Sequence, residues 1–160
     1  MMAAEGRILG PAIIAATAAA DQASKAFVRA SADLLEGGLT VVPGFDLVLH
    51  RNEGIAFGLL RGLPWWVLVL LAGIIVALLA SAMLRSDSRI EIAAYGAIIG
   101  GAIGNVIDRV RIGGVTDFLD LYVGTAHWPA FNLADVFVVS GVAVLLFQAS
   151  WGRQGDDHPT

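Results

Sequence analysis

Polar residues within and beside the apolar stretches of this chain are concentrated in five short strings. The strings are D-Q-A-S-K at 21–25, N-E-G-I-A-F-G at 52–58, G-N-V-I-D-R at 104–109, V-T-D-F at 115–118 and F-N-L-A-D at 131–135. Aspartate and asparagine recur in these strings. Their carboxyl groups can transfer protons, and their amides can form hydrogen bonds. The chain has no cysteine, which excludes a thiol nucleophile, a disulfide scaffold and thiolate metal sites.

Other hydrolytic motifs are missing from the sequence. There is no H-E-x-x-H for a zinc site and no G-x-S-x-G for a serine nucleophile, and Ser140 lies in an apolar stretch without an obvious histidine base. A metal site made of Asp117, Asp135 and His127 stays open, because carboxylates and imidazole both bind divalent metals. No ligand spacing supports such a site.

The composition explains where these polar strings must lie. The 160 residues are 57% hydrophobic and 15% charged, with a mean hydropathy of +0.74. A soluble domain of this size carries about 25% charged residues. The net charge of −4 offers no basic surface for nucleic acid. The sequence therefore predicts an integral membrane protein of one domain, residues 1–160.

Four charge-free windows predict the membrane helices. They cover residues 8–20, 62–84, 92–107 and 136–152. A helix needs roughly 20 residues to cross the hydrocarbon of a bilayer. Only the second window is long enough to cross it without including a charged residue. We expect a membrane all-α fold with four transmembrane helices, at about 8–25, 62–84, 91–108 and 134–151.

The distribution of cations predicts the orientation of these helices. Four cations lie in the two tails and in the short connection between the second and third helices: Arg7, Arg85, Arg89 and Arg153. Arginine and lysine concentrate on the cytoplasmic side of membrane proteins. Both termini are therefore expected in the cytoplasm, although Arg51 and Arg61 on the other side weaken this bias.

With this orientation, the three short helices carry an aspartate at the same membrane face. Asp21, Asp108 and Asp135 lie at these ends. Because a carboxylate at membrane depth is costly, it usually faces a bundle interior or a watery cavity. The pattern indicates a site near the outer face. An alternative is a cleaved secretory signal at residues 8–20, which would leave three spans and break the common face.

The two outer connections cover about residues 26–61 and 109–133. Residues 40–42 and 45–49, separated by Pro43 and Gly44, predict two short strands around a turn. We therefore expect a small extracytoplasmic β-segment between the first and second helices. Gly96, Gly100 and Gly104 recur every four residues in the third helix, which favours close helix packing.

The five polar strings together resemble those of the bacterial lipoprotein signal peptidases (signal peptidase II), which are intramembrane aspartyl proteases with four transmembrane helices. The resemblance covers about residues 8–147, and all five strings occur in the order of the family. It implies that Asp117 and Asp135 are the catalytic aspartates. It also implies that seven further residues line the site or bind substrate: Asp21, Asn52, Gly54, Asn105, Asp108, Arg109 and Asn132. No metal or other cofactor is expected.

Elementary chemistry agrees with this resemblance. Peptide hydrolysis without metal, serine or cysteine needs one group to take a proton from water and another to give a proton to the carbonyl oxygen. Two neighbouring carboxyl groups that share a proton can do both. Asp120 is a third acid nearby, which we expect to be solvated.

Structural roles remain open for several of these residues. Asp108 and Arg109 would form an ion pair with each other. Asp21 and Lys25 have the i, i+4 spacing of a helical pair. Asn105 and Asn132 would hydrogen-bond between helices as readily as they would touch substrate.

The resemblance also implies the substrate, a prolipoprotein whose cysteine already carries a diacylglyceryl group and which is cut just before that cysteine. The protease would be a monomer of the bacterial cytoplasmic membrane, in contact with lipid, with its site near the extracytoplasmic face. Strands in the first outer connection could hold an extended peptide by strand addition. The alternatives are an ion-coupled transporter, which intramembrane carboxylates also mark, and a purely structural membrane subunit.

Overall fold

The computed structural model describes residues 2–54 and 64–154, with the backbone alone at 2–7 and 151–154. It contains four long helices: α1 (Met2–Ala30), α2 (Trp65–Arg85), α3 (Arg89–Ile112) and α4 (Leu133–Gln154). A short 3-10 helix, η1 (Ala32–Leu35), follows α1. The strands are β1 (Leu39–Val42), β2 (Phe45–Asn52), β3 (Val115–Val123) and β4 (Ala126–His127). Residues 55–58 of the N-E-G-I-A-F-G string lie outside the described residues.

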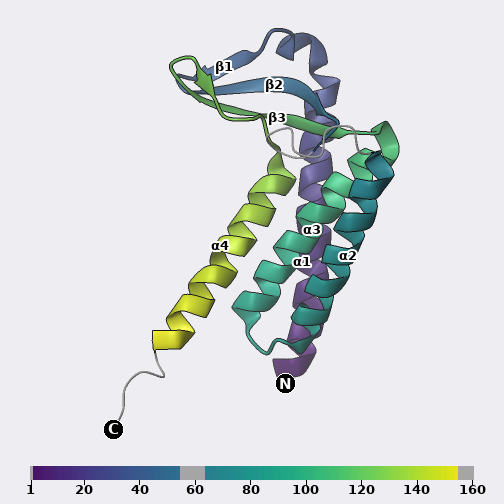
Figure 1. Cartoon of the computed structure of the whole chain (residues 1–160), viewed down its shortest axis with the longest axis vertical. Coiled ribbons are helices and arrows are strands. Elements are labelled where there is room, and N and C mark those ends of the chain that lie inside the picture. The colour runs from purple at the N-terminus through teal and green to yellow at the C-terminus, as the bar shows by residue number, and fades with distance from the viewer. Residues whose placement is uncertain (1, 55–63, 155–160) are drawn as a thin grey trace.

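The helices form a bundle with the sheet across one end, and both described chain ends lie at the opposite end (Figure 1). Helix α3 packs against α1, α2 and α4. It begins at the N-cap Ser88, whose hydroxyl accepts the backbone N–H of Glu91, and it ends at Gly113 in the left-handed region, with φ 71°. These two signals fix both ends of the central helix and direct the chain into β3.

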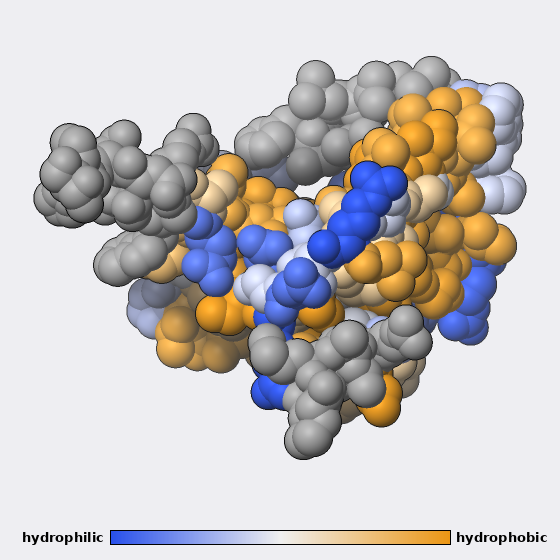
Figure 2. All heavy atoms as spheres, turned by 90° about the horizontal axis from the view of Figure 1, so that it is seen from below, coloured by the Kyte–Doolittle hydropathy of each residue, from blue (hydrophilic) through white to orange (hydrophobic). Residues whose placement is uncertain are grey.

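Three helical segments in the described part of the chain are long and apolar enough to cross a membrane. They are α2, α3 and residues 133–150 of α4. Much of the outward surface is apolar, as Leu78 in α2 and Leu146 in α4 show, each 67% exposed. Viewed from the end opposite the sheet, hydrophilic residues gather in the middle of the end face and hydrophobic residues occupy much of its outer edge (Figure 2). This mostly helical protein therefore has the surface of a membrane protein.

The sheet has the strand order β1-β2-β3-β4, and each neighbouring pair is antiparallel. The expected small β-segment is present, but it extends beyond the first connection. Strand β3 comes from the connection between α3 and α4, which the sequence analysis did not predict to contain a strand. It pairs with β2 so that Asn52 lies opposite Val115 and His50 lies opposite Asp117. The sheet therefore joins the two connections into one structure.

Glycines allow α1 and α4 to approach α3 closely. A Cβ atom at Gly96 would lie 3.1 Å from the side chain of Ile13 in α1, and one at Gly101 would lie 2.5 Å from the carbonyl oxygen of Ala134 in α4. At Gly104 a Cβ would collide with the carboxylate of Asp21. The expected role of the spaced glycines in helix packing is confirmed, and α3 presents glycines to two neighbours.

Candidate active site

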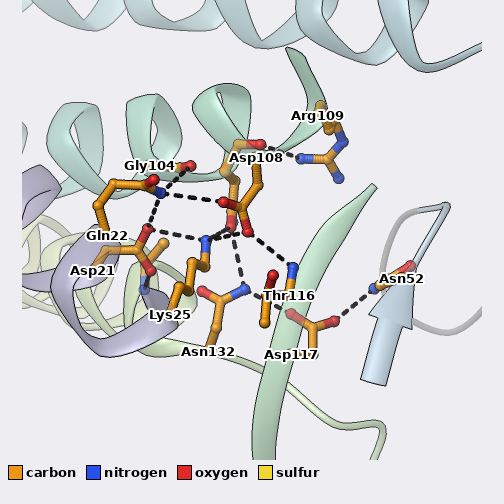
Figure 3. A network of polar contacts seen from close by, with 12 residues as sticks. Asp21, Gln22, Lys25, Asn52, Gly104, Asp108, Arg109, Thr116, Asp117 and Asn132 are labelled. Atoms are coloured by element: carbon orange, nitrogen blue, oxygen red, sulfur yellow. Dashed lines mark hydrogen bonds and ion pairs between the residues drawn. The ribbon is translucent and has the colours of Figure 1, made fainter. Parts of the chain in front are cut away.

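Asp117 lies in β3 and is held by two amides. Its Oδ2 accepts a hydrogen bond from Nδ2 of Asn52 at 2.9 Å, and its Oδ1 accepts one from Nδ2 of Asn132 at 2.6 Å (Figure 3). Asn52 is the last residue of β2, and the β2–β3 pairing brings it beside Asp117. Only 2% of Asp117 is exposed. Neutral donors on both oxygens therefore replace the water that this carboxyl group loses on burial.

Asp135 lies in the first turn of α4, where it and Asn132 form reciprocal hydrogen bonds. Oδ1 of Asn132 accepts the backbone N–H of Asp135 at 3.1 Å, and Oδ2 of Asp135 accepts the backbone N–H of Asn132 at 3.1 Å. This is a capping box with an aspartate at its third position. The second carboxylate oxygen of Asp135 accepts Nδ2 of Asn105 at 2.9 Å.

The amides of Asn132 and Asn105 connect the two aspartates. Nδ2 of Asn132 donates both to Asp117 and, at 3.1 Å, to Oδ1 of Asn105. Nδ2 of Asn105 in turn donates to Asp135. The backbone between the aspartates supports this arrangement, because the carbonyl oxygen of Phe131 accepts the N–H groups of two β3 residues. Strand β3 is thereby held against the residue that precedes Asn132.

The environment of Asp117 changes its acidity. The pKa of Asp117 is raised from 3.8 to about 6, chiefly by burial and to a smaller extent by the nearby charge of Asp135, whereas the hydrogen bonds from Asn52 and Asn132 act to lower it. Asp117 is thus a carboxyl group that keeps its proton to a higher pH than an ordinary aspartic acid. A protonated and an ionised carboxyl group side by side can act as general acid and general base.

A buried ionic cluster lies next to the aspartates, between α1 and α3. The ammonium group of Lys25 lies 2.9 Å from Oδ2 of Asp21 and 3.6 Å from Oδ2 of Asp108. Lys25 and Asp21 have no exposed side-chain surface, and Asp108 has 1%. Arg29 contacts Asp108 at 3.3 Å. The i, i+4 pairing of Asp21 with Lys25 is confirmed.

Asp108 also fixes the start of β3, and it does not pair with Arg109. Its Oδ2 accepts the backbone N–H of Thr116 at 2.9 Å, next to Asp117. The possible ion pair between Asp108 and Arg109 is wrong: the described ion-pair partners of Asp108 are Lys25 and Arg29. Asp108 therefore links the ionic cluster to the strand that carries Asp117.

Arg109 contacts backbone oxygens instead. Its guanidinium group donates to the carbonyl oxygen of Gly54 at 3.1 Å and to that of Asn105 at 3.3 Å. The contact with Gly54 ties α3 to the chain that follows β2. All nine residues implied by the resemblance are thus connected by hydrogen bonds or by sequence neighbours around Asp117 and Asp135, with Gly54 joined through its backbone.

Asp120 is separate from this network. It was expected to be solvated, but the structure shows it largely buried and paired. Its carboxylate lies 2.8 Å from Nδ1 of His127 and is 13% exposed, and His127 stacks on Tyr122 with ring centroids 4.9 Å apart. Within the described ranges, no group of three metal-ligating side chains comes together. His127 is paired with Asp120 and not with Asp117 or Asp135 among the described ion pairs.

Arg29 and Thr116 also contribute to the site, although neither is among the site residues predicted from the sequence. Arg29 donates to the hydroxyl of Thr116 at 2.9 Å and pairs with Asp108. Arg29 lies one helical turn beyond Lys25, so the spacing Asp21, Lys25, Arg29 along one face of α1 was the available signal. Nothing in the sequence distinguishes Thr116, because its role depends on the backbone position of β3.

Comparison with known proteins identifies the family. The sequence model of the family described as signal peptidase (SPase) II matches residues 13–151. A lipoprotein signal peptidase of Methylobacterium sp. (strain 4-46) is 40% identical over 154 residues, covering 94% of this chain and 93% of that protein. A lipoprotein signal peptidase of Oleidesulfovibrio alaskensis is 44% identical over 135 residues, covering 81% and 86%.

Two solved structures, each described as a bacterial membrane enzyme, have the same fold. One superposes with a TM-score of 0.81 at 25% identity, covering 94% of this chain and 93% of the other. The second gives a TM-score of 0.75 at 28% identity, covering 88% and 91%. The likeness therefore extends through the helices and the sheet together. This chain belongs to the signal peptidase II family of membrane proteases.

Proposed function

We propose that this lipoprotein signal peptidase is an aspartyl endopeptidase that cuts diacylglyceryl-modified prolipoproteins just before the lipidated cysteine. The observation that supports it most directly is the hydrogen-bonded connection from Asp117 through Asn132 to Asp135. Two carboxyl groups that share one set of donors, one of them protonated to about pH 6, meet the requirement for hydrolysis without a metal or a covalent intermediate.

In the proposed reaction the two aspartates act as a pair. The ionised carboxylate takes a proton from water as the water oxygen attacks the peptide carbonyl carbon, and the protonated partner gives its proton to the carbonyl oxygen. The tetrahedral diol then collapses: the carboxyl group that holds the proton from water gives it to the amine nitrogen of the cysteine as the C–N bond breaks, and the other carboxylate takes a proton from a diol hydroxyl, which restores both groups. Asn52, Asn105 and Asn132 hold both carboxyl groups in position throughout.

We also propose α1 as the fourth membrane span. Residues 8–20 of α1 carry no charge, and Asp21, Lys25 and Arg29 beyond them face polar partners inside the bundle. Both described chain ends lie at the end opposite the sheet (Figure 1). With the termini in the cytoplasm, the site lies near the extracytoplasmic face of the bacterial cytoplasmic membrane. The chain acts as a monomer, and the diacylglyceryl group of the substrate stays in the surrounding lipid.

The proposal is tested with purified protein and a diacylglyceryl-modified precursor. Asp117→Asn and Asp135→Asn are each expected to abolish release of the signal peptide, because an amide cannot transfer the proton that the reaction needs. Both variants are expected to stay folded. Asp120→Asn is the matched control, since it changes an aspartate of the same strand that is outside the network. Full cleavage by either of the first two variants would overturn the assignment of the aspartates.

A further inference from the structure

Lys25 is a buried cation that has no role in the reaction proposed above. Its ammonium group has no exposed surface and makes three polar contacts with the residues that the structure describes. Two are with the carboxylates of Asp21 and Asp108. The third is a hydrogen bond of 2.8 Å to Oδ1 of Asn105, which is a residue of the catalytic network. An ammonium group has three donors and no acceptor, so this contact has a direction.

That direction determines how the amide of Asn105 is turned. Oδ1 of Asn105 accepts from Lys25 and from Asn132, and its Nδ2 donates to Asp135 at 2.9 Å. Turning the amide by half a rotation would bring its NH2 group against the ammonium of Lys25. It would also bring its oxygen against the carboxylate of Asp135. Both contacts would then be repulsive in a site with little water to screen them.

The ion pairs of the cluster do not require this contact. Asp21 lies one turn before Lys25 on α1 and pairs with it at 2.9 Å. Asp108 has Arg29 at 3.3 Å and the backbone N–H of Thr116 at 2.9 Å. Lys25 nevertheless reaches from α1 to the side chain on α3 that contacts Asp135 in α4.

We propose that Lys25 is a positioning residue that holds the Asn105 amide in the orientation that donates to Asp135. The role rests on the proposed function of Asp135. Among the described contacts, Lys25 touches neither Asp117 nor Asp135, the two aspartates of the proposed catalytic dyad. It acts on Asp135 through the side-chain amide of Asn105. Its removal should therefore slow the chemical step and leave substrate binding nearly unchanged.

The test needs a variant that keeps the cluster neutral, since Lys25→Met alone would strand the carboxylate of Asp21 in the interior. Asp21→Asn removes this charge and keeps an oxygen for the backbone N–H of Ala134, which Asp21 accepts at 3.0 Å. Asp21→Asn is therefore the reference, and Asp21→Asn with Lys25→Met is the test. Both are measured again with Asn105→Ala added, on the full chain in lipid with the diacylglyceryl-modified precursor.

In the reference protein, Lys25→Met is expected to lower kcat about tenfold and to change KM by less than about twofold. With Asn105→Ala present, the same change should lower kcat by less than about twofold, because the amide through which Lys25 acts is gone. Thermal unfolding of each variant, followed in the same lipid, reports the folded fraction by which kcat is corrected.

An equal loss of kcat with and without Asn105 would overturn the proposal, and so would a loss confined to KM or to the folded fraction. The dyad is tested separately. Activity in Asp117→Asn or Asp135→Asn would overturn the proposed function whatever Lys25→Met does. If Asp117→Asn and Asp135→Asn are inactive but Lys25→Met lowers kcat equally with and without Asn105, only the positioning role of Lys25 would be overturned.

Discussion

The carboxylate of Asp21 accepts the backbone N–H of Ala134 at 3.0 Å, which joins α1 to the first turn of α4. Ala134 is completely buried and directly precedes Asp135. The first N–H groups of a helix have no partner within the helix, and an anion there is favoured by the helix dipole. Asp21 therefore anchors the helix end that carries one of the proposed catalytic groups.

Replacing Asp21 with alanine should destabilise the protein by about 3 kcal/mol or more, because Lys25 and the N–H of Ala134 would both lose a buried partner. Asp21→Asn keeps an acceptor for Ala134 and should be the less damaging change. Unfolding of the two variants in detergent measures the difference. Equal stability of both would show that the anchor contributes nothing through the backbone N–H.

Glycine-to-alanine changes should destabilise the protein where α3 packs against α1 and should be tolerated in α2. At Gly100 and Gly104 a Cβ would collide with Thr17 and Asp21 of α1, so each change should cost about 1–3 kcal/mol. Gly73 in α2 has open space around it, and Gly73→Ala should be neutral or stabilise by up to about 1 kcal/mol. Thermal unfolding of the three variants tests this ranking, which a similar loss in all three would contradict.

The raised pKa of Asp117 predicts how stability depends on pH. The folded protein keeps this proton until about pH 6, whereas the unfolded chain releases it near pH 3.8. The folded state therefore loses stability as pH rises through this interval, by about 3 kcal/mol when the group is fully ionised. Asp117→Asn should lack this loss, so its stability relative to the native protein should increase between pH 4 and pH 7. Parallel curves for the two proteins would contradict the prediction.

The outer strand of the sheet is expected to hold substrate. Strand β1 lies at the sheet edge, and Val41 and Val42 are about half exposed, at 49% and 53%. An extended peptide could add to this edge. Deleting Leu39–Val42 should raise KM for the lipidated precursor several-fold and leave kcat at saturation nearly unchanged. Cleavage with an unaltered KM would count against strand addition at β1.

Much of the helical architecture could be predicted because it depends on local composition. Apolar windows between charges become helices in any membrane setting, and spaced glycines indicate where helices approach. Strand β3 was missed because the pairing of residues such as Asp117 with β2 joins segments more than 60 residues apart. The contact between Asp120 and His127 is local, but it was missed because it exists only once β3 and β4 form a hairpin.

The ionic partners show where sequence adjacency misleads. Asp108 and Arg109 are neighbours in sequence, but successive residues of a helix point about 100° apart. Asp108 therefore faces α1, where Lys25 and Arg29 lie one turn apart, while Arg109 faces Gly54. The spacing of Asp21 and Lys25 was predictive because residues four apart share a helix face.

The hairpin between Asp117 and Asp135 has a consequence for how the enzyme tolerates different membranes. Backbone hydrogen bonds between β3 and Phe131 connect the strand of one aspartate to the helix start of the other. Bilayers of different thickness change helix tilt, but a tilt of α4 would pivot about its first turn, which Asp21 and Asn132 hold. Cleavage rates in bilayers of short-chain and long-chain lipids are therefore expected to be similar.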